Sequence, residues 1–270
     1  MSLSTDTTAP TLTPQFTQIP TTSLAEEEEE NLGNECKELI RSLPKERGWR
    51  TPFIYLFQGF WCQPEEIQSI ISFQKHFQAR DSDVILASIP KSGTTWIKAL
   101  SFAIMHRHHF AGPNKKNHPL LTSNPHELVP FLEYQVYAKN QVPDLSNLPK
   151  PRIFGTKSNV PFASLQESIK TSSCPVVYVC RNPFDTFISS WHFMNKVKPE
   201  SLPSIPLEEA FNMYCKGVIG WGPFWEHMLG YWNESIRRPE KVLFIKYEEM
   251  KEDTISQLKK LASFRGPFLN

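Results

Sequence analysis

Short apolar runs alternate with amphipathic stretches along most of the chain, and their order predicts an α/β fold. Residues 84–89 are mostly apolar and lack the alternation of a half-exposed strand, as expected of a buried parallel strand. A similar β-branched run covers 176–180. Each run leads into a stretch with helical periodicity, at 94–106 and from about 184. This alternation predicts a single domain with a mainly parallel central sheet flanked by helices.

Weaker patterns complete the order of elements. Further strands are predicted at 53–57, 152–156 and 242–246, and further helices at 64–74, at 165–170 and around Leu207, Pro223 and Met250. The polar, proline-rich stretch 108–125 predicts a long loop, placed to cap a site. Residues 1–30 are rich in Thr, Pro and Ser and end in five glutamates, which favours a solvated, disordered tail over an interaction segment. The domain therefore covers 31–270.

Composition narrows the partners and the compartment. The chain has 29 Lys+Arg and 28 Asp+Glu, so its net charge of +1 predicts neither nucleic acid nor a membrane surface as a partner. Five cysteines without a CxxC pair are typical of a reducing compartment. With no signal-peptide pattern and no apolar run of about 18 residues, we expect a cytoplasmic protein. The His-Arg-His-His run at 106–109 has no second ligand cluster, so no metal site is predicted.

The most informative local pattern is Ile-Pro-Lys-Ser-Gly-Thr-Thr-Trp at 89–96, between a predicted strand and a predicted helix. Backbone N–H groups and the helix dipole make such a junction an anion site. Gly93 lets the backbone approach a phosphate, Thr94 and Thr95 add hydroxyl donors, and Lys91 adds a positive charge. Because the lysine precedes the glycine, this is not the Walker pattern. An ordinary turn with a capping threonine is the less favoured alternative.

A second strand–turn–helix junction at 177–191 offers another anion site. Arg181 stands at the strand end, and Ser189 follows about two helical turns later, so both can converge on one phosphate. A planar guanidinium that is always charged is well suited to that task. A structural salt bridge between Arg181 and Asp185 is the alternative, and this segment by itself leaves both open.

These two motifs, in this order, resemble those of cytosolic sulfotransferases, especially plant members such as the flavonol, brassinosteroid and hydroxyjasmonate enzymes. PKSGTTW is similar to the family's 5′-phosphosulfate loop, and 177–191 is similar to its 3′-phosphate motif. Further likeness lies at 55–61, 218–225 and 246–253, and the resemblance covers about 53–268. It implies a P-loop-like α/β fold, the donor 3′-phosphoadenylyl sulfate (PAPS), the product nucleotide PAP and no metal. It also implies sulfuryl transfer to a hydroxyl of a small hydrophobic acceptor, phenolic or steroid-like.

The resemblance also implies roles for single residues. Lys91 would contact the bridging oxygen of the donor, and Trp96 would stack on the adenine. Trp221 stands where the family has an adenine-contacting tyrosine. The implied cofactor-binding set is Lys91, Ser92, Gly93, Thr94, Thr95, Trp96, Arg181, Ser189 and Trp221. Aromatic candidates for the acceptor pocket, each equally plausible as core, are Phe57, Phe60, Trp61, Phe131 and Phe162. His192 either shapes that pocket or packs in the core, and core packing is favoured.

The sequence departs from the family where a general-base histidine is expected. Lys157 occupies that position, and two extra residues precede Pro161. Losing a general base typically costs ~10²- to 10⁴-fold in rate. A lysine titrates near ~10.4 in water and would need a pKa lowered by roughly three units to act as a base at neutral pH. Lys157 is therefore the candidate at the base position, although anion binding or solvent exposure is the favoured role.

The second departure is at the C-terminus. The family continues past Leu261 into an Arg-Lys-Gly triplet, a Gly-Asp-Trp-Lys signature and a dimer motif, whereas 264–270 diverge from that pattern. We therefore expect the C-terminal part of the family domain to be missing and the protein to be a monomer or a weak homodimer. An impaired, truncated relative that only binds nucleotide or partners is the alternative function. A P-loop kinase would need a Walker lysine and a magnesium-binding acid, and neither is evident.

Overall fold

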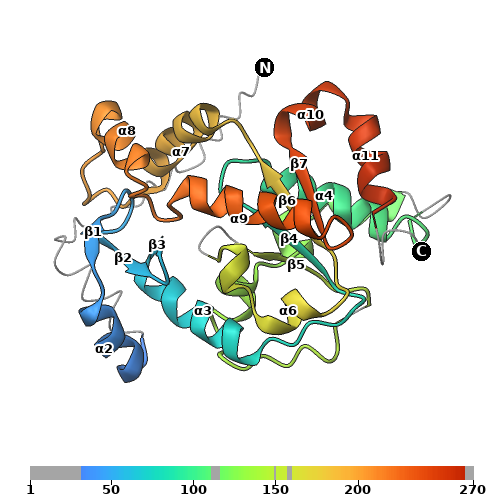
Figure 1. Ribbon diagram of the computed structural model, residues 1–270, viewed down its shortest axis with the longest axis horizontal. Coiled ribbons are helices and arrows are strands. Elements are labelled where there is room, and N and C mark those ends of the chain that lie inside the picture. The colour runs from blue at the N-terminus through green and yellow to red at the C-terminus, as the bar shows by residue number, and fades with distance from the viewer. Residues whose placement is uncertain (1–31, 111–115, 149, 157–159, 265–270) are drawn as a thin grey trace, which may run out of the picture.

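A four-stranded parallel sheet lies at the centre of the computed structural model, which describes residues 32–110, 116–148, 150–156 and 160–264 (Figure 1). The strands follow the order β5-β4-β6-β7 across the sheet. Their bounds are β4 (Val84–Ser88), β5 (Ile153–Thr156), β6 (Val176–Cys180) and β7 (Val242–Lys246). All residues of β4 and β6 are buried, as their apolar sequences require of strands covered on both faces. The predicted α/β fold is confirmed.

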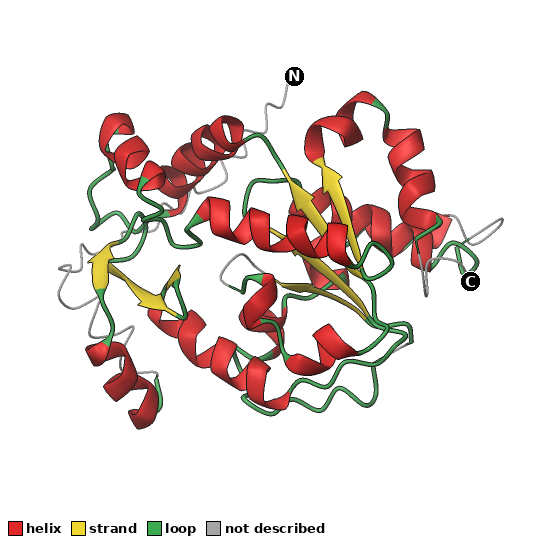
Figure 2. Cartoon of the chain, in the orientation of Figure 1, coloured by secondary structure: helices red, strands yellow, loops and turns green. Residues whose placement is uncertain are grey.

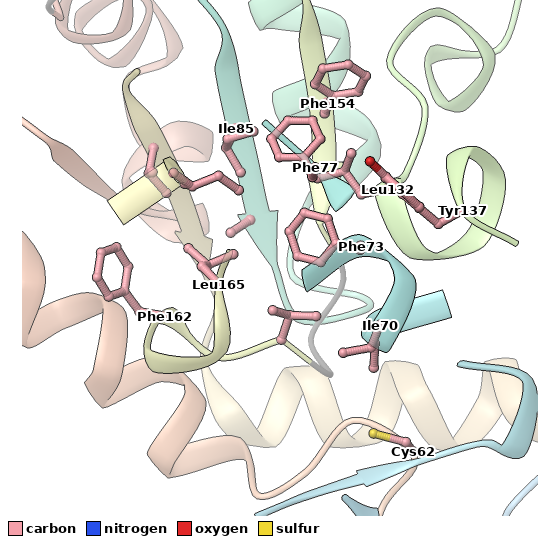
Figure 3. Close-up of a cluster of buried hydrophobic side chains, with 14 of the residues drawn as sticks. Cys62, Ile70, Phe73, Phe77, Ile85, Leu132, Tyr137, Phe154, Phe162 and Leu165 are labelled. Atoms are coloured by element: carbon pink, nitrogen blue, oxygen red, sulfur yellow. The ribbon is translucent and has the colours of Figure 1, made fainter. Parts of the chain in front are cut away.

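Helices cover both faces of this sheet because successive side chains of a strand point to opposite faces. Ile85 and Ala87 of β4 belong to a core cluster with α3 (Pro64–His76) and α9 (Phe224–Arg237). Figure 3 shows part of this cluster, with the Phe73 and Phe77 rings beside Ile85.

The opposite face carries a second cluster. Val84 and Leu86 pack there with α4 (Thr94–Met105), α10 (Tyr247–Glu252) and α11 (Thr254–Ala262). Figure 2 shows the helices arranged around the strands. A third cluster joins α7 (Pro183–Val197) and α8 (Leu207–Cys215) to the segment before α9.

A small antiparallel sheet lies apart from the parallel one. It consists of β1 (Lys45–Arg47), β2 (Phe53–Phe57) and β3 (Phe60–Cys62). The strand predicted at 53–57 is thus confirmed, but it belongs to this sheet. Positive φ angles of 51° at Gln58 and 82° at Gly59 make the tight turn between β2 and β3. Trp61 N–H donates to the Gly222 carbonyl at 2.8 Å, which ties the small sheet to the segment before α9.

The remaining elements are short. They are α2 (Asn34–Ser42), α5 (Pro125–Leu128) and α6 (Glu167–Thr171), with single turns at Pro119–Leu121, Leu132–Val136 and Phe162–Ser164. Among its described residues, the stretch predicted as a loop at 108–125 contains the helical turn Pro119–Leu121, and it ends at the start of α5. The predicted tail at 1–30 lies outside the described residues. Four of the five cysteines are buried, and Cys215 is exposed.

Candidate functional site

A cleft of about 630 Å³ lies at the carboxyl ends of β4 and β6. The two strands are neighbours in the sheet. From β4 the chain first forms β5 on one side of β4 and then β6 on the opposite side. Such a switch in strand order is where open parallel sheets bind ligands. The residues that line the cleft are Arg50, Gln63, Pro90, Lys91, Gly93, Thr94, Thr95, Trp96, His126, Phe131, Tyr134, Arg181, Ser189, Phe193, Met194, Trp221 and Tyr247.

The loop between β4 and α4 turns sharply at Gly93. Gly93 is the N-cap of α4 and has a φ of 102°, which favours glycine. A Cβ at this position would lie 2.7 Å from the Tyr247 ring. The hydroxyls of Ser88 and Thr94 are hydrogen-bonded at 2.6 Å, which fixes the first helical residue to the end of β4. The first turn of α4 then presents N–H groups without intrahelical partners at the edge of the cleft.

Two cations meet beside this loop. Arg181 donates from Nη1 to the Lys91 carbonyl at 3.2 Å, and its guanidinium lies 4.9 Å from the Tyr247 ring centroid. The Lys91 ammonium lies 4.4 Å from the Phe193 ring centroid. Desolvation, together with the charge of Arg181, lowers the pKa of Lys91. Bringing two positive charges together in a partly desolvated place favours an anionic ligand.

Both alternatives for Arg181 are present in the structure. Its Nη2 lies 3.4 Å from the Asp185 carboxylate, so the salt bridge predicted as the alternative forms. The Asp185 side chain is 59% exposed, and a pair in such contact with water contributes little. The same guanidinium lines the cleft, where its buried Nε has no hydrogen-bond partner among the residues that the structure describes. The salt bridge therefore leaves part of Arg181 available to a ligand.

Most of the predicted cofactor-binding residues are brought together in this cleft. Those that line the cleft are Lys91, Gly93, Thr94, Thr95, Trp96, Arg181, Ser189 and Trp221. Ser92 is fully buried and is not part of the lining. Trp221 is 4% exposed, and its buried Nε1 has no hydrogen-bond partner in the described part of the chain. Lys157 lies outside the described residues.

Of the five aromatic candidates for the acceptor pocket, one lines the cleft and four do not. Phe131 lines the cleft, whereas Phe60 packs against His227 and Phe162 packs against Tyr231. Phe57 and Trp61 are half-buried outside the lining. The core role favoured for His192 is wrong, because this side chain is exposed. The next residue of the same helix, Phe193, lines the cleft.

Several lining residues were not predicted from the sequence. Tyr247 follows β7 directly, as Arg181 follows β6, so the rule that ligands meet strand ends could have found it. His126 and Tyr134 come from the segment before β5, and Arg50 and Gln63 come from the N-terminal region. No local pattern marks these four, because their place in the cleft depends on packing between distant segments.

The described residues contain no group of three or more His, Cys, Asp or Glu side chains that could hold a metal ion. Within the histidine run, His106 Nδ1 lies 3.0 Å from the Phe102 carbonyl, and its ring stacks on the Phe102 ring. These contacts explain His106 as part of the packing around α4.

The fold and the cleft define an α/β protein in which two strand–helix junctions meet at the switch point of a parallel sheet. A model of the sulfotransferase domain matches residues 81–269, and the chain therefore belongs to the sulfotransferase family. It is 61% identical to Cytosolic sulfotransferase 15 of Arabidopsis thaliana over 239 residues, which are 88% of this chain and 66% of that protein. Cytosolic sulfotransferase 14 is also 61% identical, over 90% of this chain and 70% of its own. The chain thus spans about two thirds of the length of these relatives.

Solved structures agree with this assignment. The crystal structure of an Arabidopsis thaliana sulphotransferase is 49% identical, with a TM-score of 0.77 over 87% of this chain and 79% of its own. A mouse sulfotransferase in complex with PAP is 26% identical, with a TM-score of 0.57 over 78% of this chain and 68% of its own. Among the helices that the structure describes, none is long and apolar enough to span a membrane.

Proposed function

We propose that this protein transfers a sulfuryl group from PAPS to a hydroxyl of a small hydrophobic acceptor in the cytoplasm. The observation that carries the proposal is the meeting of both anion-binding junctions in one cleft at the switch point of the sheet. Membership of the sulfotransferase family supports the reaction class, and the mouse relative was solved with PAP.

The residues of the phosphate loop fit the 5′-phosphosulfate end of this donor. Gly93, with its φ of 102°, makes the turn that would direct backbone N–H groups toward a phosphate. Thr94 and Thr95 would donate from their hydroxyls together with the N–H groups of the first turn of α4. In the reaction a new bond forms between the acceptor oxygen and sulfur, the bond from sulfur to the bridging oxygen breaks, and the proton of the acceptor hydroxyl passes to a base or to water. The Lys91 ammonium would stabilise the negative charge that develops on that leaving oxygen.

The second junction fits the other end of the nucleotide. Arg181 and Ser189 both line the cleft and would hold the 3′-phosphate. Trp96 and Trp221 both line the cleft and would offer flat apolar faces to the adenine.

The acceptor would bind against the apolar wall of the cleft. Phe131 and Tyr134 come from one helical turn and Phe193 comes from α7, and all three line it. Rings of this kind favour an apolar, flat acceptor such as a phenol or a steroid-like alcohol. We further propose that the protein acts as a monomer or a weak homodimer and needs no metal.

A relative that binds the nucleotide but turns over slowly is the second candidate function. It is favoured by Lys157, which stands where the family has its histidine base. A lysine that remains protonated cannot remove the acceptor proton, so turnover would depend on water or on another group.

A transfer assay separates these two functions. The full chain is incubated with PAPS and a panel of phenols and steroid-like alcohols, and PAP and sulfated product are quantified. We expect both in equal amounts, and a loss of about 10²- to 10³-fold for Lys91→Met. If the wild type is slow and Lys157→His accelerates it by about 10²-fold or more, the missing base is the defect. Absence of product from both the wild type and Lys157→His would refute catalysis by this chain.

A further inference from the structure

His126 occupies a defined position between the two walls of the cleft. It lies in α5, a single helical turn whose N-cap Asn124 accepts a hydrogen bond from the His126 N–H at 2.9 Å. Pro125 at the first helical position restricts the backbone of the same turn. The histidine backbone is therefore held by local contacts, and its side chain is presented to the cleft from a fixed base.

The imidazole contacts one residue on each side. Its Nε2 lies 3.0 Å from the hydroxyl oxygen of Thr95, in the phosphate loop. Its ring stacks on Phe131 with centroids 5.2 Å apart and an interplanar angle of 23°. Phe131 is fixed in turn, because the buried Lys98 ammonium lies 3.0 Å from its ring centroid and donates to the Val129 carbonyl at 2.8 Å. His126 thus joins the loop proposed for the donor to the wall proposed for the acceptor.

The direction of the hydrogen bond decides what Thr95 offers to a ligand. If the Thr95 hydroxyl donates to the imidazole, it turns only lone pairs toward the cleft. If Nε2 carries the proton and donates, the Thr95 hydroxyl is free to donate outward. A phosphate has acceptors only, so it requires the second arrangement.

We infer that His126 is a positioning residue that orients the Thr95 hydroxyl toward the 5′-phosphate of the donor nucleotide. The inference rests on the proposed function, because it assigns a phosphate to this loop. The ring is not a general base for the acceptor, since Nε2 is engaged by Thr95 and Nδ1 is buried. His126 therefore contributes to the affinity for the donor nucleotide, and it does so through the Thr95 hydroxyl.

The test measures PAP affinity by calorimetry in four variants of the full chain. His126→Phe keeps a ring that can stack on Phe131 but has no donor at Nε2, and we expect PAP to bind about tenfold more weakly. His126→Gln carries an amide nitrogen at a similar reach, so it should stay within about threefold of the wild type. Thr95→Val should weaken binding about as much as His126→Phe. The double variant should be no weaker than Thr95→Val, because both changes remove one interaction.

His106→Phe is the matched control. His106 also stacks on a phenylalanine, with centroids 4.2 Å apart and an angle of 24°, but it does not line the cleft. Its PAP affinity should equal that of the wild type.

Three results would overturn the inference while leaving the proposed function intact. The first is a PAP affinity of His126→Phe equal to that of the wild type. The second is a loss of PAP affinity in His126→Gln as large as that in His126→Phe. The third is an additive loss of about a hundredfold in the double variant. A wild-type chain that does not bind PAP would overturn the proposed function itself, and the inference with it. The acceptor KM adds a second readout. This KM should stay at the wild-type value in His126→Phe, which keeps the stacking on Phe131. It should rise in His126→Ala, which loses that stacking.

Discussion

At the scale of single residues, Gly93 is the position where shape and function are most closely joined. Its φ of 102° and the 2.7 Å approach of the Tyr247 ring leave no room for a side chain. We expect Gly93→Ala to lower the free energy of unfolding by about 1–3 kcal/mol and to weaken PAP binding more than tenfold. Chemical denaturation and calorimetry measure the two effects.

Gly59 provides the matched control, because its φ is 82° but nothing lies within 4 Å of a Cβ there. Gly59→Ala should cost only the backbone strain, about 1 kcal/mol, and should leave PAP affinity unchanged. Equal effects of the two substitutions on PAP binding would show that the close approach at Gly93 has no functional role.

At the scale of elements, α9 is held against the sheet by polar groups as well as by apolar packing. The Tyr178 hydroxyl of β6 and His227 Nδ1 of α9 lie 3.0 Å apart, and Tyr178 stacks on Tyr231 with centroids 4.4 Å apart. Burial lowers the pKa of His227 to about 3. The folded state therefore holds this histidine neutral, whereas the unfolded chain takes up a proton near pH ~6.5.

This difference has a definite sign. Since the unfolded state binds more protons, stability falls as pH drops from about 6.5 toward 3 and is constant with respect to this group above that window. We expect His227 to account for a loss of about 2 kcal/mol between pH 6.5 and 5. Urea denaturation of the wild type and His227→Phe at both pH values tests this. The variant should be about 1–3 kcal/mol less stable at pH 7, because the Tyr178 hydroxyl loses its partner, and should show a smaller change with pH.

If His227→Phe kept the full pH dependence of the wild type, another group would be responsible and the role assigned to His227 would be wrong.

At the scale of the whole molecule, the strand order places two junctions from distant parts of the chain at one cleft. Ligand that binds both should stabilise the entire fold. At 100 times its dissociation constant, PAP should add ~2.7 kcal/mol and raise the unfolding midpoint by a few degrees. AMP, which lacks the 3′-phosphate, should stabilise less at the same concentration.

Arg181→Leu separates the contributions of the two junctions. If Arg181 binds the 3′-phosphate, this variant should lose most of the difference between PAP and AMP and keep the response to AMP. A midpoint that PAP does not move in the wild type would contradict the proposed donor site. An undiminished difference in the variant would contradict only the role of Arg181.

The sequence by itself determined the features that depend on neighbouring residues. The apolar runs at β4, β6 and β7 and the helices after them follow from local hydrophobic patterns. Each of the two anion motifs lies where a strand ends and a helix begins. Residues predicted from both motifs line one cleft. Local chemistry was sufficient because a phosphate-binding turn is made by a few consecutive residues.

Only the tertiary structure decided what depends on residues far apart in the chain. It set the order β5-β4-β6-β7, placed 53–57 in a separate sheet and left His192 exposed beside Phe193, which faces the cleft. It also brought His126 into contact with Thr95, and no spacing in the sequence predicts this contact. The physical reason is that such contacts form when apolar faces from many segments are buried together, and a linear pattern does not specify which segments will meet.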